Sequence, residues 1–558
     1  MRSLISAFAL LVAMAVPSVA AMAQDAPPAA TPAPAPATPP KLIIAISVDQ
    51  FSADLFAQYR QRFTGGLARL ANGVVFPSGY QAHAATETCP GHSTILTGSH
   101  PARTGIIANN WFDLSLARDD KRVYCSEDPT VEGTSSASGR YAPSINYLRV
   151  PTLGDWMSDA DPRTQVVSVA GKDRAAIMMG GRQADELWWL APTGLASYRG
   201  REQAADVAQI SAAVATAIAT PRPALDLPTI CAPQDMAVDI GGGRTVGTGR
   251  FQRDGGNFRA FLASPEADGT VLAAGAALRA SRRLGEGSQT DLLILGLSAT
   301  DYVGHAVGTE GAEMCIQMLA LDRELGDFFA RMDATGIDYA VVLTADHGGH
   351  DTPERNRQNA IPAAERVDAA LTPAALGDAL KAELGLTVDG SLLHGDAPFG
   401  DIYVSRALTA SQRTRVIDAA VRRLSAHRQV EHIYRGSEIA ALPVSRRSPE
   451  LWSVAERLRA SYDPERSGDL LLVLKDRVTP IPETGLGYIA THGSVWDYDR
   501  RVPMLFWRAG MRGFEQPNPV MTVDILPTLA GLIGLPIPAD RIDGRCLDLI
   551  AGQESSCP

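Results

Sequence analysis

Hydrophobic residues are concentrated in short continuous runs, separated by longer stretches with helical spacing. Three of the runs, at 42–48, 291–297 and 339–344, contain almost only apolar residues. A run of this length without alternation is typical of a strand that is buried on both faces. Apolar residues recur at helical spacing over 273–284 and 310–332. Buried strands that alternate with helices predict an α/β fold with a mostly parallel central sheet flanked by helices.

The region 349–466 differs from the rest of the chain, because it is rich in Arg, Glu and Ala and has helical spacing. A strand at 401–404, a helix at 411–426 and a strand at 430–434 are predicted to form a β-α-β unit within it. We interpret the region as an inserted α+β cap. It would divide one α/β core into two parts, residues 41–348 and 467–558.

Beyond the cap, we expect the chain to return to the central sheet with the apolar run 469–474. A strand at 503–507 and a closing helix at 524–533 complete the predicted core. Gly534 follows that helix, which is a common way for a helix to end.

The N-terminus has the pattern of a secretory signal peptide over residues 1–23. A basic start, an apolar stretch from Leu4 to Val16 and small residues before Gln24 are typical of such a segment. Residues 24–40 are rich in Pro and Ala, which predicts an extended, disordered tether. We expect the mature protein to be periplasmic or secreted. The apolar stretch is too short for a typical membrane span, and an uncleaved anchor is the alternative.

Composition and charge narrow the class of protein. The 558 residues are 45% hydrophobic and 20% charged, as in globular proteins, and the length exceeds that of one ordinary core. The formal net charge of -11 argues against a nucleic-acid binder, which needs a basic face. An anionic substrate would then require cations placed locally at its site.

The chain contains six cysteines, whose spacing matches no zinc-binding pattern. In an oxidising compartment disulfides are the expected state of exposed cysteines. We expect Cys546 to pair with Cys557, and Cys125 with Cys231. The other two are expected to be unpaired: Cys315 as a buried thiol in a helix, and Cys89.

Carboxylates and imidazoles lie just after the predicted strands, joined by one histidine from the C-terminal part. They are Asp49, Asp301, His305, Asp346, His347 and His492. The carboxyl ends of parallel strands meet at one edge of a sheet, so we expect one shared cleft. Taken singly, such residues more often form turns or helix caps than bind a metal ion. Together, six ligands are too many for one tetrahedral zinc and suit two, and imidazoles favour zinc over magnesium or calcium. The other histidines, His83, His92 and His350, are interpreted as supports for loops or ligands.

Six segments resemble the alkaline phosphatase superfamily in order and spacing. They are IIAISVDQF, TETCPGHSTILTGSHPARTGIIANNWFD, GLSATDYVGH, LTADHGG, THGSVWDYDRRVPMLFW and VDILPTLAGLIGLPIPADRIDGR. The branch they resemble most is the type I phosphodiesterase and nucleotide pyrophosphatase group, and within it the bacterial phosphate-irrepressible alkaline phosphatases. The resemblance covers nearly all of the mature chain. It implies two zinc ions, one on Asp301, His305 and His492, and one on Asp49, Asp346 and His347.

The resemblance also implies that Thr88, in T-C-P-G-H, is the nucleophile and adjoins the second zinc. Such an enzyme would pass through a phosphothreonine. From the residues alone, Thr88 could be a plain helix cap, and Thr86 is its nearest competitor. Cys89 suggests a sulfatase, but the C-x-P-x-R context is missing because Gly91 and Ser93 stand at the proline and basic positions.

Three further residues are expected to bind the transferred phosphoryl group. Asn109 matches the family carboxamide, with Asn110 as the alternative. Lys172 and Arg174 follow a predicted strand, and an extended i, i+2 pair would project both cations to one face. Such a charged turn is ordinarily solvated surface. The resemblance implies instead that this K-x-R pair separates monoesterases from diesterases in the branch.

The sequence therefore predicts an exported alkaline phosphatase that hydrolyses phosphate monoesters through a phosphothreonine at a two-zinc site. The alternative is a phosphodiesterase or nucleotide pyrophosphatase on the same scaffold. A more distant alternative is a non-catalytic exported metal-binding protein, although no expected ligand is missing. The expected partners are small phosphorylated substrates, with no nucleic acid or membrane, and a monomer is favoured.

Overall fold

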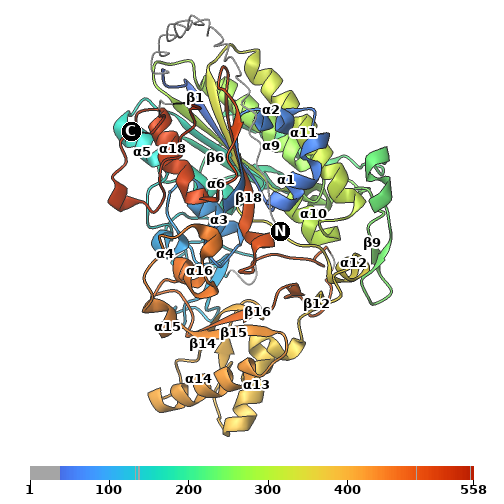
Figure 1. Ribbon diagram of the computed structural model, residues 1–558, viewed down its shortest axis with the longest axis vertical. Helices are drawn as coiled ribbons and strands as arrows, with labels where there is room; N and C mark the ends of the chain where they lie inside the picture. The colour runs from blue at the N-terminus through green and yellow to red at the C-terminus, as the bar shows by residue number, and fades with distance from the viewer. Residues whose placement is uncertain (1–37, 132, 136–138, 486, 553–554, 558) are drawn as a thin grey trace, which may run out of the picture. The chain divides into compact units, whose positions relative to one another are not determined.

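A ten-stranded sheet forms the centre of the fold (Figure 1). Five neighbouring strands of it run parallel to one another: β11 (Tyr339–Thr344), β1 (Leu42–Val48), β10 (Asp291–Leu297), β5 (Val166–Ala170) and β6 (Glu186–Ala191). Every residue of β1, β10 and β11 is buried, which confirms the strands predicted from the three apolar runs. The mostly parallel α/β architecture is also confirmed.

The computed structural model describes residues 38–131, 133–135, 139–485, 487–552 and 555–557. The predicted signal peptide at 1–23 and nearly all of the predicted tether at 24–40 lie outside the described residues. The described residues from Pro39 onward form one compact unit.

Further strands, in both parallel and antiparallel pairings, complete both edges of the large sheet. β18 (Arg501–Arg508) lies antiparallel between β11 and β2 (Val74–Tyr80). It contains the strand predicted at 503–507. β2 also pairs with the short strands β19 (Phe514–Glu515) and β20 (Val520–Met521), and β7 (Gly194–Ala196) pairs with β6 at the other edge.

Helices cover both faces of this sheet, which explains why β1 is apolar throughout. Ile44 and Ile46 belong to a core cluster shared with α9 (Pro265–Arg282) and α11 (Ala312–Asp333). Ile43 and Ala45 face the opposite cluster. Helices contributing to that cluster are α3 (Thr88–Ile95), α5 (Leu153–Ala160), α6 (Asp173–Gly180) and α18 (Ile525–Leu532). Successive strand residues point to opposite faces, so a strand between two helical layers needs no polar alternation.

A second sheet of four strands, in the order β13-β14-β16-β15, forms the cap. Its strands are β13 (Leu393–His394), β14 (Gly400–Val404), β16 (Leu470–Leu474) and β15 (Val430–Arg435). The helices α13 (Pro373–Leu384) and α14 (Ala410–Ser425) share one core cluster with these strands. The elements predicted for the β-α-β unit are therefore present.

The predicted return of 469–474 to the central sheet is wrong. The segment forms β16, which pairs antiparallel with both β14 and β15 in the cap. Leu470 and Leu472 pack toward the cap helices, whereas Leu471 and Val473 pack on a cluster that includes α16 (Val454–Ser461). Both faces of β16 are thus buried, and an apolar run shows burial without showing which sheet provides it. The proposed ranges 41–348, 349–466 and 467–558 stay a prediction.

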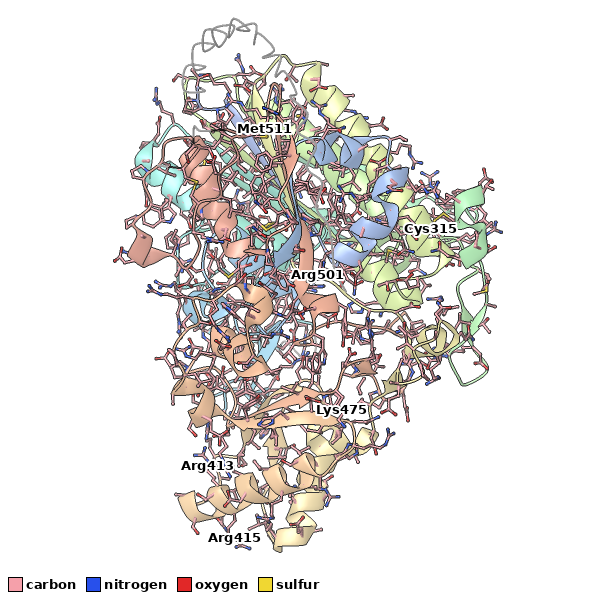
Figure 2. All side chains as sticks on the ribbon, in the orientation of Figure 1. Cys315, Arg413, Arg415, Lys475, Arg501 and Met511 are labelled. Atoms are coloured by element: carbon pink, nitrogen blue, oxygen red, sulfur yellow. A yellow bond between two sulfur atoms is a disulfide. The ribbon has the colours of Figure 1, made fainter. Side chains whose placement is uncertain are left out.

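Three disulfides join the six cysteines, and one of the two predicted pairs is confirmed. Cys546 pairs with Cys557 as expected. The predicted Cys125–Cys231 pair, the buried thiol at Cys315 and the unpaired Cys89 are wrong. The other disulfides are Cys89–Cys125 and Cys231–Cys315. Cys315 is labelled in Figure 2. Each joins a helix cysteine to one in a distant segment of the chain, and such proximity depends on tertiary packing that spacing does not reveal.

Within the described residues, no helix has the length and apolar character that a membrane span requires.

Candidate active site

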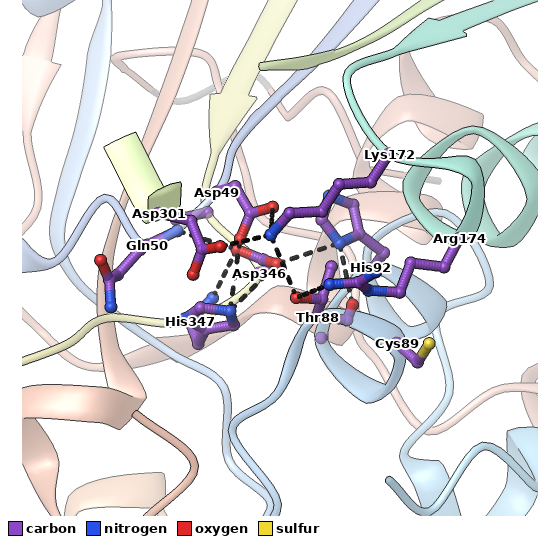
Figure 3. Close-up of polar contacts among 12 residues, drawn as sticks. Asp49, Gln50, Thr88, Cys89, His92, Lys172, Arg174, Asp301, Asp346 and His347 are labelled. Carbon is purple, nitrogen blue, oxygen red and sulfur yellow. Dashed lines mark hydrogen bonds and ion pairs between the residues drawn. The ribbon is translucent and has the colours of Figure 1, made fainter. Parts of the chain in front are cut away.

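The six candidate metal ligands form two compact groups at the carboxyl ends of the central strands. Figure 3 shows four of them, Asp49, Asp301, Asp346 and His347. Asp49 directly follows β1, and Asp346 and His347 follow β11. Asp301 and His305 lie on α10 (Ala299–Val307), which follows β10. In each group the ligand atoms lie within 4.8 Å of one another: Asp301, His305 and His492 in one, Asp49, Asp346 and His347 in the other. These are the two sets that the sequence suggested.

Backbone carbonyls orient the three imidazoles. Nδ1 of His305 lies 2.8 Å from the carbonyl oxygen of Ala490. Nδ1 of His347 and of His492 lie at the same distance from the carbonyl oxygens of Gly348 and Thr86, respectively. A carbonyl oxygen can only accept, so each Nδ1 carries a proton, and Nε2 is the ring nitrogen left to bind a metal ion. This is how metal-binding histidines are usually held.

The free Nε2 atoms face carboxylate oxygens at a separation that suits tetrahedral zinc. Nε2 of His305 and of His492 lie 3.3 and 3.2 Å from Asp301 Oδ1. Nε2 of His347 lies 3.3 Å from oxygens of both Asp49 and Asp346. Two tetrahedral ligands at about 2.0–2.1 Å from zinc are about 3.3 Å apart.

Three of these buried polar atoms make no hydrogen bond to any described residue: Oδ1 of Asp49, Oδ1 of Asp301 and Nε2 of His347. Buried polar atoms without partners are costly, whereas a bound cation would satisfy them. The residues present therefore fit divalent metal ions.

The electrostatics of the two groups agree with that fit. Burial lowers the pKa of His492 to about 3, which keeps its imidazole neutral. Burial would also lower the pKa of His347, but the carboxylates of Asp346 and Asp49 raise it to about 9. A histidine pKa that rises despite burial indicates a site of net negative potential, which favours cations.

Thr88 is the first residue of α3 and is buried, with 1% of its surface exposed. Its hydroxyl lies 3.5 Å from Nζ of Lys172 and 3.4 Å from Nη2 of Arg174 (Figure 3). The hydroxyl of Thr86 is engaged elsewhere, because it donates to the carbonyl of Ser494 at 2.7 Å. The geometry thus distinguishes two threonines that local sequence could not separate.

Close packing explains the glycine in T-C-P-G-H. A Cβ at Gly91 would lie 2.0 Å from the carbonyl oxygen of Asp346. His92, one residue later, places Nδ1 3.0 Å from Asp346 Oδ2, in agreement with the supporting role predicted for it. The start of α3 therefore sits directly against the end of β11.

The predicted extended geometry of Lys172 and Arg174 is wrong, although both side chains reach one point. Lys172 is the extended N-cap of α6, and Arg174 lies in its first turn. Helix formation begins earlier than the strand pattern suggested, because Asp173 is favourable in a first helical turn. Nζ of Lys172 also lies 2.5 Å from Oδ2 of Asp49 and of Asp301. It therefore bridges the two ligand groups.

The side chain of Asn109 contacts the first turn of α3, whereas that of Asn110 makes its hydrogen bond elsewhere. Oδ1 of Asn109 accepts a hydrogen bond from the backbone N–H of Cys89 at 2.8 Å, and its own N–H donates to Glu87 at 2.6 Å. Asn110 instead donates its side-chain amide to Asp396 at 3.1 Å. The geometry favours Asn109 as the residue beside Thr88.

Sequence reasoning missed two features of this region. Tyr124 accepts a hydrogen bond from Arg174, and the Cys89–Cys125 disulfide ties its neighbour to the residue after Thr88. Lone aromatic and cysteine residues carry no local pattern that would identify them.

Comparisons with known proteins agree with this arrangement. Residues 43–495 match the family described as Type I phosphodiesterase / nucleotide pyrophosphatase. Alkaline phosphatase PhoK of Sphingomonas sp. is 58% identical over 524 residues, which cover 93% of each chain. Alkaline phosphatase PhoD of Zymomonas mobilis is 49% identical, over 93% of this chain and 89% of that one. Among solved structures, wild type alkaline phosphatase PafA has a sequence that is 25% identical to this chain, and its crystal structure matches with a TM-score of 0.78. The match covers 92% of this chain and all of the PafA chain.

Proposed function

The chain belongs to the type I phosphodiesterase / nucleotide pyrophosphatase family, and on that premise we propose that it is an alkaline phosphatase, a hydrolase of phosphate monoesters. The observation that carries the proposal is the convergence of Lys172 and Arg174 on the hydroxyl of Thr88, beside two groups of metal ligands. Two cationic side chains in contact with one buried hydroxyl suit the dianionic group of a monoester.

We propose that two zinc ions occupy the two ligand groups. Three correctly oriented imidazoles and ligand separations of 3.2–3.3 Å support zinc over magnesium or calcium. Metal ions bound there would supply Lewis-acid chemistry, lowering the pKa of a neighbouring hydroxyl and stabilising charge on the attacking and leaving oxygens.

Thr88 is proposed as the nucleophile. Its Oγ1 forms a bond to phosphorus while the ester P–O bond breaks and the alcohol departs. Water then breaks the bond between Thr88 and phosphorus and releases inorganic phosphate. The position of Thr88 at the start of α3 supports this role, because helix N-terminal amides stabilise negative charge.

Asn109, Lys172 and Arg174 are proposed to bind the remaining phosphoryl oxygens. A monoester presents three such oxygens and two negative charges, whereas a diester has one oxygen capped and one charge fewer. Two cations beside Thr88 therefore stabilise the monoester selectively. The phosphodiesterase alternative remains the competing function within this family, because it uses the same scaffold without that selectivity.

We propose further that the protein is exported and acts as a monomer on small phosphorylated molecules. The three disulfides support an oxidising compartment, the periplasm or the exterior. The net charge of -11 disfavours nucleic acid as a partner.

The test is a comparison of kcat/KM for an aryl phosphate monoester and for the methyl diester with the same aryl leaving group. Zinc-loaded protein is expected to prefer the monoester strongly. Equal or greater activity on the diester would overturn the assignment in favour of a phosphodiesterase. The variant Thr88→Ala serves as the control for contaminating phosphatases.

A further inference from the structure

We propose that Tyr124 is a positioning residue that holds Arg174 against the phosphoryl group and so sets the preference for monoesters. The inference rests on the proposed function. Among the described residues, the hydrogen bonds of Arg174 go to Tyr124 and Thr88, through Nη1 and Nη2 respectively, each at 3.4 Å. Its Nε is buried and makes no hydrogen bond to any residue that the structure describes. The phenol of Tyr124 thus holds the guanidinium at Nη1, while Nη2 contacts the hydroxyl of Thr88.

The direction of the hydrogen bonds makes the phenol of Tyr124 an acceptor for Arg174. Tyr124 donates its hydroxyl proton to Oδ1 of Asp173 at 2.8 Å. Its oxygen lone pairs are therefore left for Nη1 of Arg174. Oδ2 of Asp173 accepts from a second phenol, that of Tyr141, at 2.7 Å. The carboxylate of Asp173 thus reaches Arg174 through a phenol rather than as a direct ion pair.

This arrangement orients Arg174 without neutralising it. A carboxylate in direct contact would compete with the phosphoryl group for the guanidinium and offset much of its charge. A neutral phenol oxygen holds the guanidinium plane and leaves its charge for the substrate. Within the described part of the chain, no carboxylate forms an ion pair with Arg174, in contrast to Lys172, which contacts two.

The position of Tyr124 is itself fixed by the hairpin of β3 (Asn110–Phe112) and β4 (Arg122–Tyr124), in which it lies opposite Asn110. The next residue, Cys125, donates its backbone N–H to the carbonyl of Asn109 at 3.0 Å. Cys125 also forms the disulfide with Cys89, which follows Thr88. One hairpin therefore ties together Asn109, the start of α3 and, through Tyr124, Arg174.

Two phenylalanine variants test the role of Tyr124. Tyr124→Phe removes the contact with Arg174 and one hydrogen bond to Asp173. The matched control, Tyr141→Phe, removes an equivalent hydrogen bond to Asp173 but no contact with Arg174. With Tyr124→Phe, we expect kcat/KM to fall about tenfold to a hundredfold on the monoester and less than about threefold on the diester. The inhibition constant of inorganic phosphate is expected to rise by a similar factor, whereas Tyr141→Phe keeps the ratio of the two rates.

The decisive readout is a double-mutant cycle with Arg174→Ala. If Tyr124 acts through Arg174, Tyr124→Phe costs less than about twofold in the Arg174→Ala protein. An equal loss in both backgrounds, equal losses on both substrates, or equal effects of the two phenylalanine variants would overturn the proposal. Melting temperatures of both phenylalanine variants report any loss of folding. The wild-type preference between monoester and diester tests the proposed function separately, because it does not involve Tyr124→Phe.

Discussion

The preference for monoesters should depend on the two cations beside Thr88, which the double variant Lys172→Ala, Arg174→Ala tests. Both side chains lie 3.4–3.5 Å from the Thr88 hydroxyl, where a transferred phosphoryl group would be bound. A hydrogen bond to a charged group contributes about 1.5–3 kcal/mol, so losing both would cost about 3–6 kcal/mol. This corresponds to a loss of about 10²- to 10⁴-fold in kcat/KM for a monoester. The two effects need not add, because both residues contact one group.

A diester should lose much less, because it carries one charge fewer and has one oxygen capped. The assay is kcat/KM for an aryl monoester and its methyl diester, with the metal content of each variant measured in parallel. Metal content matters because Lys172 also contacts Asp49 and Asp301. Arg174→Ala is the matched control, because Arg174 makes no such contact in the described structure. A fall by the same factor on both substrates, at full metal content, would refute the reasoning.

Three further predictions concern the nucleophile, the metals and pH. Thr88→Ser should retain substantial activity because it keeps a hydroxyl, whereas Thr88→Ala should lose several orders of magnitude in kcat, and a wild-type rate for Thr88→Ala would contradict this role. Elemental analysis should find close to two zinc ions per chain and a chelator should abolish activity, so one ion or none in fully active protein would contradict the site. Asp499 lies buried in the short helix α17 (Asp497–Arg500). Burial raises its pKa to about 7, so the folded state holds a proton that the unfolded chain loses near pH 4. The free energy of unfolding should therefore fall by up to about 1.4 kcal/mol per pH unit between about pH 4 and 7 through this group. Asp499→Asn should remove that slope. The melting temperature of the variant minus that of the wild type should therefore increase from about pH 5 to pH 8. A difference in melting temperature that stays constant over this range would contradict the prediction.

The sequence predicted the centre of the fold well because burial leaves a direct mark on composition. β1, β10 and β11 are buried on both faces, and each has an uninterrupted apolar run. The candidate metal ligands were predictable for a related reason, since parallel strands carry whatever follows them to one edge of the sheet. β16 shows the limit of this reasoning, because its apolar run shows burial and leaves the choice of sheet open.

Features that depend on contacts between distant segments could not be predicted. The Cys89–Cys125 disulfide and the contact of Tyr124 with Arg174 join residues 36 and 50 positions apart, through a hairpin with no local signature. The fit of Lys172 between two carboxylates depends on three separate strand ends. Such contacts follow from packing, which a single sequence does not display.

Trapping the covalent enzyme tests most directly whether the hydroxyl of Thr88 accepts the phosphoryl group. Enzyme turning over an aryl phosphate monoester is quenched in acid and digested, and phosphate is located by peptide mass. We predict phosphate on Thr88, and none in Thr88→Ala protein treated in the same way. Phosphate on Thr86 instead, or undiminished turnover by Thr88→Ala, would contradict the role of Thr88 as the nucleophile.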